Sequence, residues 1–236
     1  MSYPSSSFSI TSEQALSQEQ RFWRQVGWWM VAGLALTSVI AGLLMSSPHA
    51  MGWFFVTHGA KTGLSTLGWL ALLAPMVLVF ALGFLAQTAS ALVVGTVYLL
   101  VAACFGVTLA PIGLAYTPQS LLFTLVGTLG AFAGFALWGY ITRRNLNGIG
   151  RFAFMGLIGL IVLGFVQIFW PVPVLNFMLG CGGVVVFTLL TAWDVQRLRE
   201  SSRLGDQRVA IWGALSLYLD FINLFISLLR LVGQRR

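Results

Sequence analysis

Seven apolar runs, each about as long as a bilayer-spanning helix, follow one another along the chain. They occupy residues 26–45, 66–87, 90–110, 120–141, 152–170, 174–194 and 210–232. Because hydrocarbon cannot hydrogen-bond a peptide group, runs of this kind must be helical in a membrane. The pattern predicts an all-α, polytopic membrane bundle of seven transmembrane helices.

Two segments depart from this pattern. Residues 1–20 are polar and Ser-rich, without the basic start and apolar core of a signal peptide. We expect a mobile cytoplasmic tail there, with a short amphipathic helix from Ser12, in front of a seven-helix transmembrane domain at 21–236.

The connection at 46–65 is half apolar, so we expect it to lie along the membrane interface. Pro111 is assigned to the connection after the third run.

Composition supports a protein that lives in the lipid bilayer. The chain is 58% hydrophobic and 8% charged, with a mean hydropathy of +0.89, whereas about a quarter of the residues of a soluble domain are charged. The net charge of +7 comes mostly from Arg residues that flank the apolar runs. That position sets membrane topology, and no basic face remains for nucleic acid.

The distribution of Arg and Lys predicts the orientation. Nine basic residues fall on the side that carries the N-terminus: Arg21, Arg24, Arg143, Arg144, Arg151, Arg197, Arg199, Arg203 and Arg208. The other side holds Lys61, Arg235, Arg236 and, at the edge of the last run, Arg230. Basic loops stay in the cytoplasm, so we expect a cytoplasmic N-terminus. Seven spans then place the C-terminus outside, unless the last segment is re-entrant.

Small residues recur inside several of the runs. They are Gly130 and Gly134 in the fourth, Gly156 and Gly159 in the fifth, and Gly180, Gly182 and Gly183 in the sixth. Small residues let helix backbones approach closely in lipid. We expect these positions to mark helix contacts, which indicates a bundle and does not indicate a function.

Acidic residues give the strongest functional signal. The chain has six, and only Asp194 and Asp220 lie within apolar runs. A charge at bilayer depth costs about 2.5–3.5 kcal/mol on insertion scales, and such residues usually face a bundle interior or a water-filled path. The two therefore make a candidate pH sensor and ion site.

Polar residues form a stripe along the last run. Their spacing of 3, 4, 3, 4 and 3 residues puts them on one helix face: Gly213, Ser216, Asp220, Asn223, Ser227 and Arg230. Thr188, Thr191 and Asp194 share a face of the preceding run in the same way. Neither stripe suits lipid, so we expect the two faces to meet, and Arg230 to be shielded by a central position of the last helix.

The chemistry of such a meeting has alternatives. Two carboxylates in low dielectric would share a proton, or bind a hard cation such as calcium through their oxygen atoms. A packing role, with each carboxyl hydrogen-bonded to Asn or Ser, and pairing of Asp194 with Arg197 are the structural alternatives. One difficulty is depth: counted from the run boundaries, the two acids are offset by about 15 Å along the helix axes.

Enzymatic motifs are not found. The sequence has no HExxH, GxSxG or paired His and Cys, and the contexts TAWDVQ and LYLDF differ from the YD and GxGD motifs of intramembrane aspartyl proteases. Cys104 and Cys181 are isolated in apolar runs and are expected to be small buried hydrophobic residues. We therefore expect neither an enzyme nor a cofactor, apart from transported or bound calcium.

The sequence resembles a known family. The segments TAWDVQRLRE (191–200), GALSLYLDFINLFISLLRLVGQRR (213–236), ITRRNLNGIG (141–150) and LGWLALLAPMVLVF (67–80) are similar to the bacterial branch of the Bax inhibitor family, also called the transmembrane Bax-inhibitor-motif family. The similarity covers nearly all of the chain from Gln20 onward. The two segments with aspartates are specific, and the other two are supportive.

The resemblance implies a fold, a location and an activity. The fold is a seven-helix bundle whose last helix lies centrally between two three-helix layers, in the bacterial inner membrane. The activity is a pH-sensitive calcium leak with a two-aspartate sensor, matching Asp194 and Asp220. Many relatives carry an Arg near the end of the second helix that can latch onto the aspartates, whereas Leu85 aligns there in this chain. Gating would then rest on the carboxyl pair alone, or borrow Arg143 or Arg144.

A second function remains open. Some relatives bind and restrain a membrane-bound protease, which would make this chain a regulatory protein that acts by contact. The segments expected to serve that function are the tail and the connection at 46–65. The two hypotheses differ in what they require, since a leak depends on the buried acids and a contact protein on its surface.

Overall fold

A computed structural model describes residues 12–58, 61–85, 89–202 and 206–236. Within these ranges the chain forms eight helices and one two-stranded antiparallel hairpin. The elements are α1 (Ser12–Ser46), α2 (Pro48–Phe54), β1 (Phe55–His58), β2 (Lys61–Leu64), α3 (Thr66–Leu85), α4 (Ala91–Ala115), α5 (Pro118–Ile141), α6 (Asn147–Phe169), α7 (Pro173–Ser201) and α8 (Gln207–Val232). All helices except α2 are long and apolar enough to cross a membrane. The predicted all-α membrane bundle with seven spans is confirmed.

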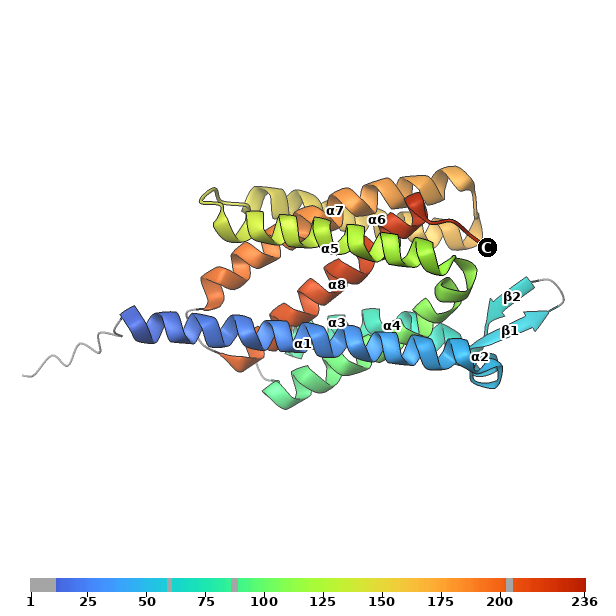
Figure 1. The fold of residues 1–236 in the computed structure, drawn as a ribbon, viewed down its shortest axis with the longest axis horizontal. Coiled ribbons are helices and arrows are strands. Elements are labelled where there is room, and N and C mark those ends of the chain that lie inside the picture. The colour runs from blue at the N-terminus through green and yellow to red at the C-terminus, as the bar shows by residue number, and fades with distance from the viewer. Residues whose placement is uncertain (1–11, 59–60, 86–88, 203–205) are drawn as a thin grey trace, which may run out of the picture.

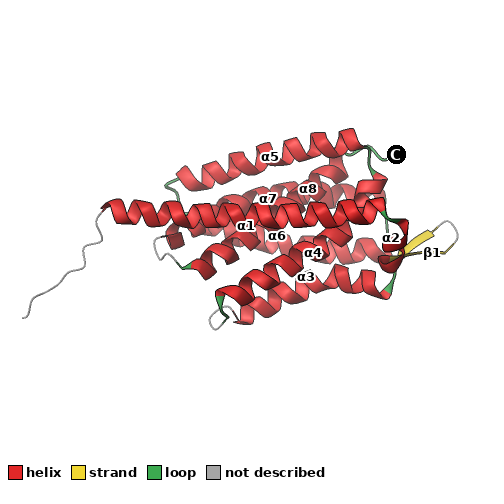
Figure 2. Cartoon of the chain, turned by 60° about the horizontal axis from the view of Figure 1, so that its bottom comes forward, coloured by secondary structure: helices red, strands yellow, loops and turns green. Residues whose placement is uncertain are grey.

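Helix α8 lies between two groups of three helices (Figure 1). One group contains α1, α3 and α4, and the other contains α5, α6 and α7; α8 packs against α1, α4, α5 and α7. It also has the largest buried share of the seven spans, at 61%. The predicted central position of the last helix is therefore confirmed. A second view shows the spanning helices running along one common axis (Figure 2).

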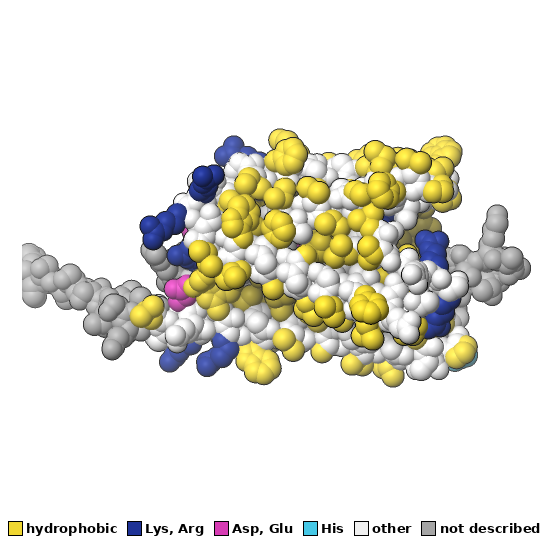
Figure 3. Space-filling model, turned by 45° about the horizontal axis from the view of Figure 1, so that its top comes forward, with side chains coloured by type: hydrophobic (Ala, Val, Ile, Leu, Met, Phe, Trp, Pro, Cys, Tyr) yellow, Lys and Arg dark blue, Asp and Glu magenta, His cyan; other side chains and the backbone are white. Residues whose placement is uncertain are grey.

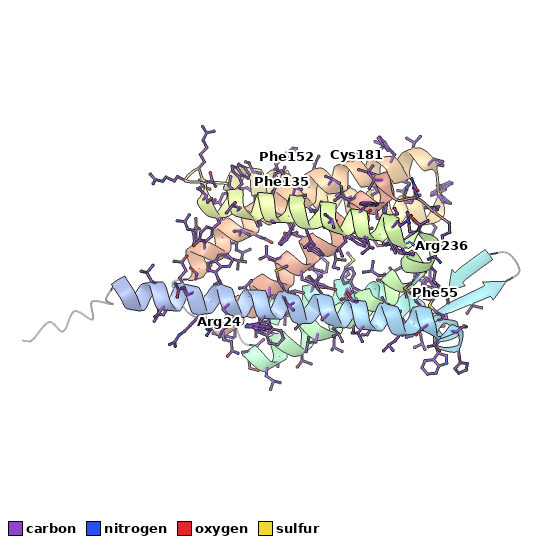
Figure 4. All side chains as sticks on the ribbon, viewed as in Figure 1. Arg24, Phe55, Phe135, Phe152, Cys181 and Arg236 are labelled. Carbon is purple, nitrogen blue, oxygen red and sulfur yellow. The ribbon has the colours of Figure 1, made fainter. Side chains whose placement is uncertain are left out.

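The surface has the character of a membrane protein. Hydrophobic side chains cover the middle of the molecule, and Lys and Arg side chains gather toward its two ends (Figure 3). Arg24 of α1 and Arg236 lie toward opposite ends (Figure 4). Helix α1 begins at the end opposite the C-terminus (Figure 1), as an odd number of spans requires. The assignment of one end to the cytoplasm stays a prediction.

Several boundaries differ from those predicted. The connection at 46–65 folds into α2 and the β1–β2 hairpin. Helix α4 continues through Pro111, so its assignment to a connection is wrong; a Pro is tolerated in membrane helices because neighbouring groups satisfy the freed carbonyl. Helix α7 continues past Asp194 to Ser201. Residues 195–201 read as a polar loop, but Val195 and Leu198 are buried and pack onto the start of α8.

The predicted tail divides at Ser12. Residues 1–11 lie outside the described part of the chain. From Ser12 onward the backbone is helical without interruption into the first span. The helix predicted to begin at Ser12 is therefore present, and it is continuous with α1.

Hydrogen bonds between side chains and backbone tie α8 to the α1–α4 side. The Thr37 hydroxyl donates to the carbonyl of Ala102 at 2.9 Å and lies 2.7 Å from the Tyr218 hydroxyl. Since Thr has one hydroxyl proton, Tyr218 is the donor in the second contact. The Tyr98 hydroxyl donates to the carbonyl of Trp29 at 2.7 Å. Three helices are thus joined by bonds that bilayer lipid cannot replace.

Close helix approaches occur at some of the predicted glycines. A Cβ at Gly183 would collide with the Ser227 side chain, and a Cβ at Gly180 or Gly156 would lie 2.7 Å from the nearest side-chain atom. At Gly130, Gly134 and Gly159, by contrast, a Cβ would meet nothing within 4 Å, so the predicted contact at Gly159 is also wrong. The expectation that this GxxxG pair marks a helix contact is therefore wrong, because its face of α5 does not meet another helix closely.

The tightest approach on α5 is at a glycine that the pattern did not mark. A Cβ at Gly139 would collide with the carbonyl group of Ala192 on α7. Backbone atoms cannot swing aside as a flexible side chain can. Gly139 therefore sets the spacing between α5 and α7 within two residues of Asp194.

We expect Gly139→Ala and Gly134→Ala to have opposite effects on stability. Gly139→Ala forces α5 away from α7 and should lower the free energy of unfolding by about 1–3 kcal/mol. Gly134→Ala adds helix propensity in open space and should leave it unchanged or raise it by up to about 1 kcal/mol. Thermal unfolding of both variants in one detergent measures the difference. Equal melting temperatures would contradict the assigned contact.

Tyr218→Phe should weaken the attachment of α8. The change keeps the ring and removes only the hydroxyl, so the cost should be about 1 kcal/mol, that of one buried hydrogen bond. Tyr140→Phe is the matched control, since the Tyr140 hydroxyl donates to Glu19 at an exposed site. Its effect should be less than about 0.5 kcal/mol. Denaturation of both variants in detergent compares their free energies of unfolding. If Tyr218→Phe lowers this free energy no more than Tyr140→Phe does, the hydrogen bond of Tyr218 does not hold α8 in place.

Candidate functional site

The candidate site lies between the neighbouring helices α7 and α8. Asp206 caps the N-terminus of α8: its carboxylate accepts a hydrogen bond from the backbone N–H of Arg208 at 2.8 Å and pairs with the Arg208 guanidinium at 2.9 Å. At Gly213, a Cβ would collide with the side chain of Leu198. At the far end of the pair, Gly183 receives Ser227. Close fits at two levels hold the helices together along most of their length.

The structure brings Asp194 and Asp220 together in the interior. Their exposed fractions are 9% and 5%, and the two carboxyl groups interact electrostatically. Neither acid projects into lipid or open solvent. The offset in depth is smaller than the run boundaries suggested, because α7 extends for seven residues beyond Asp194, which is about 10 Å of helix.

Apolar clusters lie on both sides of the carboxyl pair. Toward the α7–α8 connection the cluster includes Val195 and Leu217, and toward the other end it includes Leu190 and Leu224. The ring of Phe132 on α5 packs against both clusters. The carboxyl groups therefore lie in a medium of low dielectric, where charges interact more strongly than in water.

Hydrogen bonding within the site is incomplete. The hydroxyl of Ser216 lies against the carboxyl of Asp194. The Oδ2 atom of Asp220 is fully buried and has no hydrogen-bond partner. Buried polar atoms are nearly always paired, so this unpaired oxygen beside a second carboxyl is an exception, and it makes the pair the candidate functional group of the α7–α8 contact.

No cation neutralises the pair in the part of the chain that is described. The one ion pair recorded there joins Asp206 to Arg208. Arg197 acts on Asp194 through its field, but its guanidinium lies over the Trp193 ring at 5.7 Å. The alternative of an Asp194–Arg197 ion pair is therefore not what the structure shows.

The other basic residues considered for a latch contribute no ion pair either. Arg143 and Arg144 lie in the α5–α6 connection, and neither is paired with a carboxylate among the described residues. Leu85 ends α3, and its side chain lies outside the described residues. Among the described residues, the site therefore consists of the two carboxyl groups without a paired arginine.

Most of the predicted polar stripe is satisfied within its own helix. Thr191 donates to the carbonyl of Phe187 at 2.7 Å, Asn223 donates to that of Leu219 at 2.8 Å, and Ser227 donates to that of Asn223 at 2.7 Å. These local bonds let polar residues face a dry interior at low cost. Ser216 alone among these hydroxyl and amide residues contacts an acid. The polar residues of the stripe are therefore accommodated by bonds within their own helix, and they do not form an extended hydrogen-bond network with one another.

Arg230 lies apart from the acids. It is half-buried near the far end of α8, within electrostatic range of the Tyr116 phenol. Shielding of Arg230 was expected, and the structure shows it. A role of Arg230 in the carboxyl site was also expected, and the structure places this residue more than two helical turns beyond Asp220.

Two residues that support the site were not identified from the sequence. Gln196 of α7 accepts from the backbone N–H of Leu146 and donates to the carbonyl of Arg144, both at 2.8 Å, and so fixes the α5–α6 connection beside the site. Phe132 closes the site from α5. An uncharged Gln among basic residues and a Phe in an apolar run give no distinguishing signal in the sequence.

The donor set limits what the site can hold. No group of three or more His, Cys, Asp or Glu side chains occurs among the described residues. Calcium takes six to eight oxygen ligands in its protein sites. Two carboxyl groups and one hydroxyl suit a proton or a cation that keeps part of its water, and they do not form a complete calcium cage.

Comparison with known proteins is consistent with this architecture. The family described as "Inhibitor of apoptosis-promoting Bax1" matches residues 19–236. The inner membrane protein YbhL of Escherichia coli K12 is 37% identical over 92% of this chain and 93% of its own length. A protein of Caulobacter vibrioides is 36% identical over 86% and 84%, and one of Deinococcus radiodurans 33% identical over 96% of both chains. The chain therefore belongs to the Bax inhibitor family of integral, multi-pass inner-membrane proteins.

Proposed function

We propose that the chain is a pH-sensitive calcium leak whose closed state depends on a proton held between Asp194 and Asp220. The observation that carries the proposal is the position of the two carboxyl groups. They come from neighbouring helices, they are buried, and the Oδ2 atom of Asp220 lacks a partner. The family resemblance of the two segments around these acids supports the same function.

The mechanism follows from the charge on the pair. With one proton present, one carboxyl is neutral, the other is ionised, and the net charge of the pair is −1. Without the proton, two negative charges repel each other in a medium of low dielectric. The α7–α8 contact then opens, or a cation enters to offset the charge.

Calcium is the cargo in this mechanism. A hard cation prefers carboxylate oxygens, and the pair offers two such groups beside the hydroxyl of Ser216. Because these ligands do not complete its coordination, calcium keeps water and can leave again. A leak requires this combination, since a complete cage would retain the ion.

The missing latch affects the gate in one way. In relatives with an Arg on the second helix, that cation can offset the deprotonated pair. Among the described residues of this chain no guanidinium forms an ion pair with either acid, and Arg197 acts on Asp194 only through its field. The gate here responds to the proton and to the permeating cation without an arginine paired to the acids.

Calcium flux into vesicles that contain the purified protein tests the proposal. Because loss of the proton opens the contact, wild-type flux should rise as the pH is raised from about 5 to about 8. The rise should be at most about tenfold per pH unit for a gate with one proton. Asp194→Asn and Asp220→Asn replace one carboxyl by an uncharged amide of the same size. Both variants should keep the flux of the acidic limit at every pH, because one remaining acid has no charge to repel it.

Asp206→Asn is the matched control for this experiment. The hydrogen bonds from Arg208 lower the pKa of Asp206, so this carboxylate is ionised over the whole range and should not contribute to the pH response. Its variant should behave as the wild type. If Asp194→Asn and Asp220→Asn keep the wild-type pH response, the carboxyl pair is not the sensor. If no variant conducts calcium at any pH, including the wild type, the leak itself is excluded.

A further inference from the structure

An apolar groove of about 580 Å³ separates the two three-helix groups on one side of the bundle. Helix α1 forms one wall with Val31 and Met45, α5 forms the other with Leu125 and Leu129, and Phe221 of α8 forms part of the floor. The end of α4 also contributes to the lining. The groove lies beside the central helix and faces the surface that lipid covers.

Along α1 the groove is somewhat longer than one leaflet of the hydrocarbon core is thick. Along α1 it runs from Val31 to Met45, which is about 21 Å of helix, in the half of α1 that ends at Ser46. On α5 it covers the first half of the helix, from Leu121 to Leu129. The groove therefore occupies the half of the bundle that carries the C-terminus. Half of the hydrocarbon core is about 15 Å thick, so along α1 the groove spans that half and about 6 Å more, which is long enough for one acyl chain.

The lining offers hydrocarbon and no unpaired polar group of its own. Its two polar side chains, Thr37 and Ser38, donate to the backbone carbonyls of Ala102 and Leu34 at 2.9 and 2.8 Å. Val31 and Leu122 at its edges are 58% and 63% exposed, so the groove is open toward the membrane. A saturated or unsaturated chain, rather than a polar ligand, suits such a surface.

Basic residues of the C-terminal segment lie beside the end of α4, near the end of the groove that Gly113 lines. Gly113 lines the groove, and two residues later the chain pairs with the C-terminal segment: the backbone N–H of Arg236 donates to the carbonyl of Ala115 at 3.0 Å. The Arg235 guanidinium lies over the ring of Tyr116 at 5.7 Å. These contacts place both arginines beside the end of α4, and basic side chains gather at this end of the molecule (Figure 3).

Arg230 joins this cluster and needs an anion. It lies within electrostatic range of the same Tyr116 ring and is half-buried. No carboxylate pairs with it in the described ranges. A partly buried guanidinium without a counter-ion is costly, and a phosphate is the anion that a membrane surface supplies.

We propose that this groove is a binding site for one anionic phospholipid. An acyl chain lies along α1, α5 and the floor made by α8, and the phosphate lies between Arg230, Arg235 and Arg236. The headgroup charge complements the cluster, and the chain length complements the groove. The site is separate from the carboxyl pair, and the proposal does not depend on calcium transport.

Lipid retention on the purified protein tests the site. The protein is reconstituted in vesicles of equal parts phosphatidylglycerol and phosphatidylcholine, extracted in mild detergent, and the bound lipid is counted by native mass spectrometry. Wild type should retain one phosphatidylglycerol in preference to phosphatidylcholine. Arg235→Gln with Arg236→Gln should lower that retention by roughly tenfold or more, since each arginine near the surface adds to anionic-lipid binding.

Leu125→Trp tests the groove, because the larger ring fills the space for the chain. It should lower retention severalfold. Phe123→Trp is its control, since Phe123 is 78% exposed on α5 and does not line the groove. Arg143→Gln with Arg144→Gln controls for charge at the other end of the molecule. Both controls should retain lipid as the wild type does.

Three results would overturn the proposal. Equal retention of the two lipids by the wild type would exclude recognition of the charge. Loss with the Arg235 and Arg236 change but not with Leu125→Trp would indicate attraction at the surface without a groove site. Equal loss in the Phe123→Trp control would show that the effect comes from the α5 surface in general. Melting temperatures in pure detergent identify any variant that fails to fold, and Leu129→Trp then replaces Leu125→Trp.

Discussion

The enclosure of α8 by the two three-helix groups is the constraint on which the rest of the structure depends. A helix with an acid, an amide, several hydroxyls and a guanidinium along one face is unstable against lipid. Between α1 and α4 on one side and α5 and α7 on the other, most of these groups contact protein. The enclosure also removes water from Asp220, which makes its carboxyl sensitive to one neighbouring charge.

The two sides of α8 solve different problems. On the α1–α4 side, the hydroxyls of Thr37 and Tyr218 and the backbone of Ala102 form fixed hydrogen bonds. On the α7 side, glycines let the backbones approach, and the polar contacts involve Asp194, Ser216 and Asp220. Helix α8 therefore contributes to both the fold and the candidate site, but the hydrogen bonds that hold it to α1 and α4 are different from the polar contacts it makes with α7.

Much of this arrangement could be predicted from the sequence, since seven apolar runs set the spans and the spacing of 3 and 4 residues set the buried face of α8. The proximity of Asp194 and Asp220 could be predicted because each acid would be costly in lipid and both were therefore expected to face the interior of the bundle. The close contact at Gly139 could not be predicted, because a glycine in an apolar run is ordinary until the facing backbone is known. Local hydrogen bonds likewise explain why Thr191 and Asn223 are buried without belonging to the site.

The different bonding of the two sides of α8 has a consequence for how acidity acts on the protein. Alcohol and phenol groups keep their hydrogen across the physiological range, whereas carboxyl groups exchange it. The seam between α8 and the first three-helix group is therefore indifferent to the acidity of the medium. In the proposed mechanism the opposite seam loosens when the medium becomes less acidic and the carboxyl pair loses its proton. The bundle would then consist of a permanent half, which includes its central helix, and a half whose packing depends on pH.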